Sequence, residues 1–236
     1  MHSDVGVASN IGGVVGDIGG ASIDSNIINV SLRGSIEAPS ASNIGGIIGY
    51  NDGTWTRIED SASHINISGD DDVGGLVGFS FSTLSINRSF SAGVVDGNDD
   101  VGGILGSSFS HTIVENSYSL SNVTGVSDTG GFIGYANTGS MLQSHNVFTA
   151  GSVTAGGSNV GGSIGNRVQM LLDEIYSDTD TSTQASLVGS GSSTNITGAT
   201  TAQMQSIAYW TGQGGDWTDA TIWTLSNSDY PRLAWE

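Results

Sequence analysis

The stretch Asp72-Val-Gly-Gly-Leu-Val-Gly78 decides the fold, because it recurs along the whole first part of the chain. The spacing from one copy to the next is 28 residues in the centre and 29 to 33 residues toward both ends. A repeat of this length is typical of a solenoid, in which each repeat contacts only its neighbours. The other copies are Asn10-Ile-Gly-Gly-Val-Val-Gly16, Asn43-Ile-Gly-Gly-Ile-Ile-Gly49, Asp100-Val-Gly-Gly-Ile-Leu-Gly106, Asp128-Thr-Gly-Gly-Phe-Ile-Gly134 and Asn159-Val-Gly-Gly-Ser-Ile-Gly165.

Other columns keep the same register. Ser89-Phe-Ser91 matches Ser117-Tyr-Ser119 at a shift of 28, and Gly69, Gly97 and Gly125 are also 28 residues apart. The segments between them are short, rich in Val and Ile, and bounded by Gly, Asn, Asp and Ser, which favours strands and turns. We therefore predict an all-β parallel β-solenoid of about six glycine-rich coils, stacked about 4.8 Å apart.

This architecture assigns roles to the motif. The glycine pairs are expected where the backbone turns sharply or another backbone comes close, and the apolar residues after them are expected inside the solenoid. A β-propeller or an antiparallel sandwich is the alternative. A 28-residue unit is short for a propeller blade, whose repeats run to about 40 to 50 residues.

The repeat resembles the GLUG motif, a glycine-rich repeat of bacterial and archaeal surface proteins that include adhesin-like proteins and some secreted immunoglobulin-A peptidases. The likeness rests on Val73-Gly-Gly-Leu-Val-Gly78, its relatives and Asn116-Ser-Tyr-Ser119, and it covers roughly residues 5–165. It implies a surface or adhesive scaffold, and the motif itself carries no catalytic residue.

The C-terminal part breaks the period. We predict repeats over 1–166, an irregular connection rich in Ser, Thr and Gly over 167–199, and a Trp-rich cap over 200–236. Residues 167–175 suit a short helix or a final strand. The last segment holds Trp210, Trp217, Trp223 and Trp235, and it also resembles the ending of GLUG-type proteins. An open solenoid end exposes unpaired backbone, so a compact aromatic cap is expected there. A sugar-binding aromatic platform is the alternative.

The amino-acid composition excludes several classes of function and structure. The 236 residues carry 23 acidic against 5 basic side chains, for a net charge of −18, and lysine is absent. Such a surface disfavours the binding of nucleic acid, whose phosphates need Lys and Arg, and it suits a salty habitat, as in halophiles.

Cysteine is absent, which excludes disulfides. No apolar run is long enough for a membrane span. No signal peptide is visible, so an exported protein would contain this chain as a mature segment of a larger polypeptide.

Acidic turns supply the one candidate site. Each lies just before a glycine pair, and the 28-residue spacing stacks them on neighbouring coils. Like charges at that distance repel unless salt or a cation screens them, and oxygen-rich clusters suit Ca²⁺. The candidate metal ligands are Asp71, Asp72, Asp99, Asp100 and Asp128. The alternative is a solvated acidic ridge that keeps the chain soluble.

No catalytic motif is present. The four histidines lack metal-ligand spacing, and neither His-Glu-x-x-His nor Gly-x-Ser-x-Gly occurs. The sequence therefore predicts a non-catalytic structural or adhesive module, extracellular or at the cell surface, whose partners are surface glycans or other cell-surface proteins. A carbohydrate-active β-helix enzyme or a carbohydrate-binding module is the alternative, and a groove lined by three or more convergent carboxylates and aromatics on one face of the solenoid would favour the enzyme.

Overall fold

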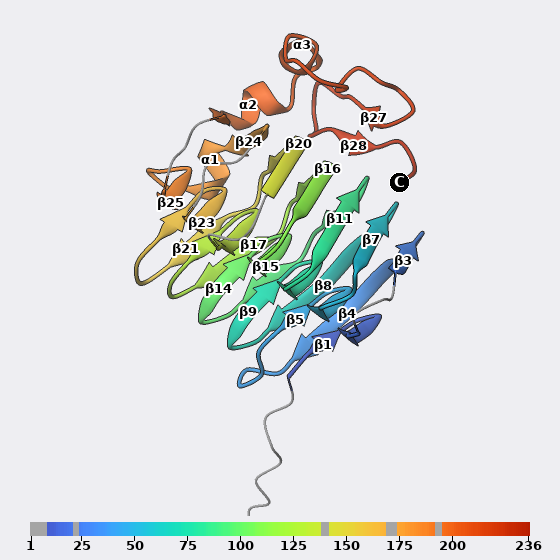
Figure 1. The fold of residues 1–236 in the computed structure, drawn as a ribbon. Helices are drawn as coiled ribbons and strands as arrows, with labels where there is room; N and C mark the ends of the chain where they lie inside the picture. Colours follow the sequence, from blue (N-terminus) through green and yellow to red (C-terminus); the bar gives the residue numbers. More distant parts are fainter. Residues whose placement is uncertain (1–8, 21–23, 138–141, 169–173, 192–194) are drawn as a thin grey trace, which may run out of the picture.

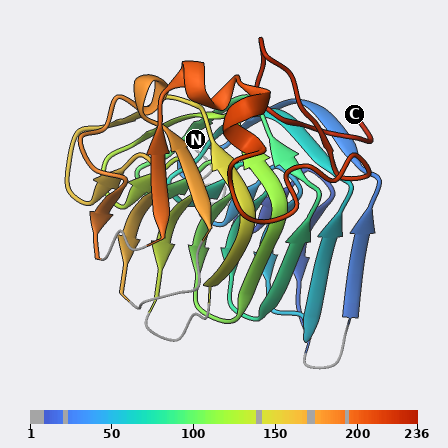
Figure 2. The same cartoon turned by 90° about the horizontal axis from the view of Figure 1, so that it is seen from above.

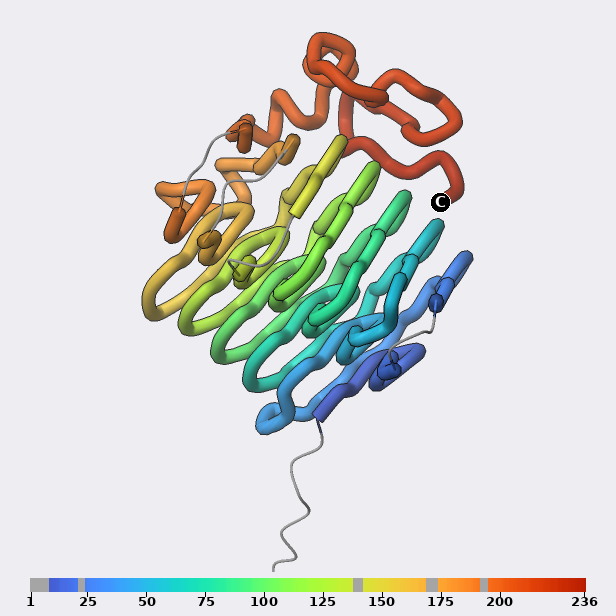
Figure 3. The backbone as a smooth tube through the Cα atoms, viewed as in Figure 1, coloured from blue at the N-terminus to red at the C-terminus, as the bar shows by residue number. Residues whose placement is uncertain are grey.

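Each repeat forms one coil of a parallel β-solenoid, as the sequence predicts. The computed structural model describes residues 9–20, 24–137, 142–168, 174–191 and 195–236. Successive coils lie side by side in chain order, and each strand pairs in parallel with its counterpart one coil away (Figures 1 and 3). The register is that of the repeat: Val73 pairs with Ile44 on one side and with Val101 on the other.

Sheet A holds the first glycine of each pair, and in the described residues it has six strands, one for each predicted coil. The strands are β1 (Ile11–Gly12), β5 (Ile44–Gly45), β9 (Asp71–Gly74), β14 (Asp99–Gly102), β18 (Thr129–Gly130) and β22 (Val160–Gly161). A Cβ on Gly74 would collide with the carbonyl oxygen of Val77, and one on Gly75 with that of Gly103 in the next coil. The pair therefore makes both the sharp turn and the close backbone approach that we expected.

Sheet B carries the apolar end of the motif. Leu76 and Val77 are completely buried, as are Ile104 and Leu105 one coil later, so these residues fill the interior as predicted. The strands are β2 (Val15–Ile18), β6 (Ile48–Asn51), β10 (Val77–Ser80), β15 (Leu105–Ser108), β19 (Ile133–Ala136), β23 (Ile164–Arg167) and β25 (Val188–Ser190).

Sheet C completes each coil with one to three strands, the longest in the described residues among them. Many of its strands alternate buried and more exposed side chains, the period of a sheet with one buried face, whereas β12, β24 and the second halves of β16 and β20 are buried throughout. They are β3 (Asp24–Ile28), β4 (Ser31–Glu37), β7 (Trp55–Glu59), β8 (Ala62–Ser68), β11 (Thr83–Asn87), β12 (Phe90–Ser91), β13 (Val94–Asp96), β16 (Thr112–Ser119), β17 (Asn122–Gly125), β20 (Leu142–Thr149), β21 (Val153–Ala155), β24 (Ile175–Asp178) and β26 (Ile196–Ala199).

The solenoid extends beyond residue 166, where the sequence placed the end of the repeats. Strands β24, β25 and β26 pair in parallel with the preceding coil or with each other. The prediction of an irregular connection over 167–199 is therefore wrong for these strands. Arg167 ends β23 and Ile175 begins β24, whereas residues 169–173 lie outside the described residues.

The C-terminal segment, residues 200–236, packs along the side of the coils, and we call it the C-terminal cover. It contains α2 (Thr201–Met204), α3 (Ile207–Trp210) and the antiparallel pair β27 (Trp223–Thr224) and β28 (Arg232–Leu233). The helix α1 (Thr179–Ser182) precedes it. Figures 1 and 2 show the cover beside the solenoid, running back across several coils. No helix in the described part of the chain is long and apolar enough to cross a membrane.

An outward-facing aromatic column receives the cover. Phe90, Tyr118, Phe148 and Tyr176 stand in register on successive coils, and the first three stack with centroids 4.7 and 4.8 Å apart. Trp210, Trp217 and Trp223 close over this column and are 1%, 1% and 3% exposed. The predicted aromatic cap is thus present, but it seals the side of the solenoid rather than only its end.

Candidate functional site

The first residue of each repeat motif adopts the left-handed backbone conformation. Non-glycine residues rarely do so, and Asn and Asp are the common exceptions. The φ angles range from 43° to 63°. Because the coils are in register, the six side chains form one row along the solenoid, which we call the Asn/Asp row. Its members are Asn10, Asn43, Asp72, Asp100, Asp128 and Asn159.

The amides in this row join neighbouring coils. Asn43 Nδ2 donates to Asn10 Oδ1 at 2.7 Å, and Asn159 Nδ2 donates to Asp128 Oδ1 at 2.5 Å. Asp72 accepts a hydrogen bond from the hydroxyl of Ser107, one coil away. These aspartates therefore have a structural reason to be where they are, which the acidic pattern alone did not reveal.

Burial raises the pKa of the acids in the middle of the row. Desolvation raises the pKa of Asp72 to about 6, against the hydrogen bond from Ser107, with the charges of Asp71 and Asp99 adding to the rise. Desolvation, followed by the charge of Asp72, raises the pKa of Asp100 to about 8. The pKa of Asp71 is also raised, by desolvation and then by its acidic neighbours. These raised pKa values weaken the ridge of charge that was expected from the sequence.

The structure brings together part of the predicted metal site. Carboxylate oxygens of Asp99, Asp100 and Asp128 lie within 4.8 Å of one another. Asp71 pairs in register with Asp99 one coil away, and Asp72 is engaged by Ser107. Ca²⁺ takes six to eight oxygen ligands, so the three carboxylates would supply part of a coordination shell. Ca²⁺ binding here stays a prediction.

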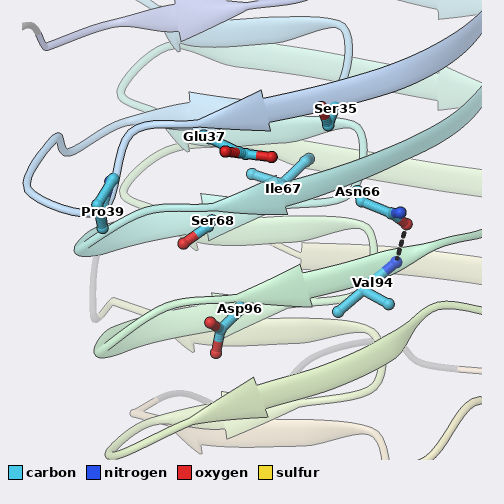
Figure 4. A pocket seen from close by; sticks show the side chains of 8 residues that line it. All are labelled: Ser35, Glu37, Pro39, Asn66, Ile67, Ser68, Val94 and Asp96. Carbon is cyan, nitrogen blue, oxygen red and sulfur yellow. Dashed lines mark hydrogen bonds between the residues drawn. The ribbon is translucent and has the colours of Figure 1, made fainter.

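The outward face of β4, β8 and β13 forms a groove (Figure 4), of about 620 Å³. Alternate side chains of these strands point outward, and the register places Ser35 beside Asn66 and Glu37 beside Ser68. Asn66 Oδ1 accepts the backbone N–H of Val94 at 3.0 Å. The lining is mostly hydrogen-bonding groups around an apolar floor: Ser35, Glu37, Pro39, Asn66, Ile67, Ser68, Val94 and Asp96.

Two carboxylates flank this groove. Glu37 and Asp96 are each in register with Ser68, on opposite sides of β8. Two strand spacings separate their backbones, roughly 9 to 10 Å. The groove's described lining contains no aromatic ring. The sequence did not single out these residues, because outward positions of a strand carry no motif and only the register reveals that they share a face.

The alternative reading of the C-terminal tryptophans as a sugar-binding platform does not hold for three of them. Trp210, Trp217 and Trp223 are buried against the solenoid, so their ring faces cannot take a ligand. Trp235 differs, since it is 37% exposed.

A second column of rings runs along sheet B and was not predicted. Tyr50, Phe79, Phe109 and Tyr135 contact one another in sequence, with ring centroids 5.3, 5.0 and 5.7 Å apart; the first pair is stacked, the second tilted and the third edge to face. Three of them, Tyr50, Phe79 and Tyr135, directly follow the final glycine of a repeat motif, a signal that could have located the column. Aromatic contacts of this kind favour offset-stacked and edge-to-face geometry, and here they join neighbouring coils.

Comparison with known proteins yields one similar structure. No protein-family model matches the chain, and no curated protein matches it. A crystal structure described as a putative immunoglobulin A1 protease from Bacteroides ovatus is similar in fold, with a TM-score of 0.52 and 19% sequence identity. The match covers 89% of this chain and 58% of that chain. At this identity the likeness is one of fold.

Proposed function

We propose that this chain is a non-catalytic adhesive module of a larger extracellular or cell-surface protein, and that the groove on β4, β8 and β13 is its contact surface for glycans or surface proteins. The groove supports this proposal. It offers serine, asparagine and carboxylate groups over an apolar floor, a combination suited to the hydroxyls and C–H surfaces of sugars.

The resemblance of the repeat to the GLUG motif of bacterial and archaeal surface proteins supports the same proposal. The similar structure adds fold alone, since it shares 19% identity with this chain. A surface location also agrees with the net charge of −18 and the absence of lysine, which disfavour nucleic acid as a partner.

A glycan array and a cell-binding screen test the proposal. The informative variant is Ser68→Tyr, which fills the groove between Glu37 and Asp96. Ser85→Tyr is its matched control, because Ser85 is a half-buried outward serine on β11. Binding that is lost in Ser68→Tyr and kept in Ser85→Tyr supports the groove. Equal binding by both variants, or no binding by the unmodified chain, contradicts the proposal.

The enzyme alternative rests on Glu37 and Asp96. Inverting glycoside hydrolases hold their two carboxyl groups about 6.5 to 9.5 Å apart, and the backbone spacing of these two residues is close to that range. A panel of polysaccharides assayed for new reducing ends distinguishes the two functions. Release of reducing ends that Glu37→Gln and Asp96→Asn both abolish would establish an enzyme in place of an adhesive module.

A further inference from the structure

A smaller pocket lies where the C-terminal cover ends against β4 and β8. Its volume is about 310 Å³, at the lower end of the range of small-molecule sites, about 300 to 1,000 Å³. It lies on the same outward face as the groove, since β4 and β8 contribute to both. The lining is Ser31, Arg33, Ala62, His64, Phe90, Trp235 and Glu236.

The cationic wall of this pocket is unusual in so acidic a chain. Arg33 and His64 are in register on neighbouring strands, so both side chains point to the same face. No ion pair joins Arg33 to another described residue, whereas Arg88 is held by Glu59 and Asp60. Burial, and then the charge of Arg33, lowers the pKa of His64, with Glu236 opposing and Arg232 adding to the effect. An anion entering the pocket would therefore meet an available guanidinium and a histidine that gains charge on acidification.

The indole of Trp235 also lines the pocket and is held in a fixed position. Trp235 Nε1 donates to the backbone oxygen of Arg88 at 2.9 Å, and the ring stacks on Phe90 at 5.8 Å. These contacts hold the ring in place although 37% of the residue is exposed. An exposed ring that is already ordered offers apolar surface at little cost in conformational entropy.

A carboxylate completes the pocket. Glu236 Oε1 accepts hydrogen bonds from the Tyr118 hydroxyl at 2.6 Å and from the Leu233 backbone N–H at 2.7 Å. The carboxylate is therefore oriented by the fold, and its second oxygen, Oε2, is the one left to accept from a ligand hydroxyl.

We propose that this pocket binds a sugar that carries a carboxylate, such as a hexuronate. The guanidinium of Arg33 takes the sugar carboxylate, because its planar fork matches that group. The indole of Trp235 packs on the C–H surface of the sugar ring, and Glu236 accepts a hydroxyl. A neutral sugar would leave Arg33 and His64 without a partner. This inference rests on the proposed glycan-binding function and names the sugar class.

The test is a titration with glucuronic acid, glucose and glucose 6-sulfate, followed by NMR at pH 5.5 and pH 8. We expect the indole N–H signal of Trp235 to shift with glucuronic acid, and an affinity for glucuronic acid at least tenfold greater than that for glucose. Binding should tighten at the more acidic pH, because protonation of His64 adds positive charge to the pocket. If glucose 6-sulfate binds more tightly than glucuronic acid, the pocket recognises a sulfate rather than a carboxylate, and the proposal is overturned.

Two variants that each remove one positive charge, one inside the pocket and one outside it, make the test specific. Arg33→Gln should weaken glucuronic acid binding at least tenfold, and His64→Gln should remove the pH dependence. Arg57→Gln is the matched control, because Arg57 is an exposed arginine on β7 that does not line the pocket. Equal affinity of Arg33→Gln and the unmodified chain would refute the site. Loss of glycan binding in Ser68→Tyr alone, with glucuronic acid never bound, would refute this inference and leave the proposed function standing.

Discussion

At the scale of single residues, the Asn/Asp row explains a choice that the sequence leaves ambiguous. Backbone geometry demands a residue that tolerates positive φ, and Asn and Asp both do. The asparagines Asn43 and Asn159 donate hydrogen bonds to the preceding coil. An ionised aspartate cannot donate, but a protonated one can. The raised pKa of Asp100 favours the protonated form, which like asparagine is able to donate a hydrogen bond.

The first prediction is that Asp100→Asn stabilises the fold and flattens its pH dependence. The pKa of Asp100 is raised from 3.8 to about 8 in the fold. Protonation of this group therefore favours the folded state most below pH 4, and that contribution is lost as the pH rises toward 8. One pKa unit corresponds to about 1.4 kcal/mol, so the full shift would set an upper limit of roughly 5 to 6 kcal/mol. Solvent screening of the cluster lowers this figure, and we expect a gain on the order of 2 kcal/mol at pH 8 that disappears near pH 4.

Urea unfolding across this pH range measures the effect. Asp24→Asn serves as the control, because Asp24 is an exposed residue at the start of β3 and its replacement removes the same charge. If both variants shift stability equally, overall charge rather than the environment of Asp100 is responsible.

A second prediction concerns the glycine pair. A Cβ on Gly103 would collide with the carbonyl oxygen of Gly131 and with the hydroxyl of Ser119. Because two coils would have to separate, Gly103→Ala should cost at least about 3 kcal/mol, a large loss for one substitution. Gly156→Ala is the comparison, since nothing lies within 4 Å of its added Cβ. Comparable unfolding midpoints for the two variants would show that the coils adjust to a methyl group at the pair.

At the scale of elements, the sequence predicts the strands that carry the full repeat motif, but it does not predict the strands in which the glycine pair is lacking. In the last coil, Leu187-Val188-Gly189 keeps only the end of the repeat. Val188 nevertheless pairs with Ile164, and Gly162 N–H donates to Ser186 where a glycine of the next pair would stand. The last coil thus keeps the apolar end of the motif but lacks the pair of adjacent glycines by which the other copies are recognised.

The cover shows the opposite limitation. Its tryptophans mark a packed aromatic segment, yet composition does not say which surface receives it. The answer depends on Phe90, Tyr118 and Phe148 standing in one column, a three-dimensional fact that follows from the repeat only once the register is known.

The third prediction tests the cover as a packed element. Trp217 is 1% exposed and contacts Phe148, Trp210 and Trp223. Trp217→Ala should therefore cost about 3 to 5 kcal/mol, as for other buried aromatic side chains. Trp235→Ala removes the same side chain from a partly exposed position and should cost clearly less. Thermal unfolding followed by circular dichroism ranks the two, and a loss for Trp217→Ala that is as small as that expected for an exposed residue would mean that the cover is not a cooperative part of the core.

At the scale of the whole molecule, repetition converts a local choice into a long-range arrangement. A residue chosen for one turn recurs one coil away, so charges, rings and amides all form columns. The columns inside the repeat could be predicted because the 28-residue period is visible. The groove and the pocket could not, because Ser35, Asn66 and Val94 belong to three coils and share no motif.

The last prediction follows from the net charge of −18 and from the acids brought together by stacking. Folding places Asp99, Asp100 and Asp128 closer together than the unfolded chain does, so their repulsion opposes folding once they are ionised. Added NaCl screens that repulsion, and the melting temperature should rise with salt.

If the three carboxylates hold Ca²⁺, millimolar Ca²⁺ should raise the melting temperature further at equal ionic strength, because a ligand of the folded state stabilises that state. The pKa of Asp100 is about 8, so a proton competes with the ion and the Ca²⁺ response should grow from pH 6 to pH 8.5. Thermal unfolding with chelator as the blank measures both effects, and Asp128→Asn should lose the Ca²⁺ response that Asp24→Asn retains. A Ca²⁺ response no greater than that of matched Na⁺ removes the metal site, and a melting temperature indifferent to salt removes the repulsion argument as well.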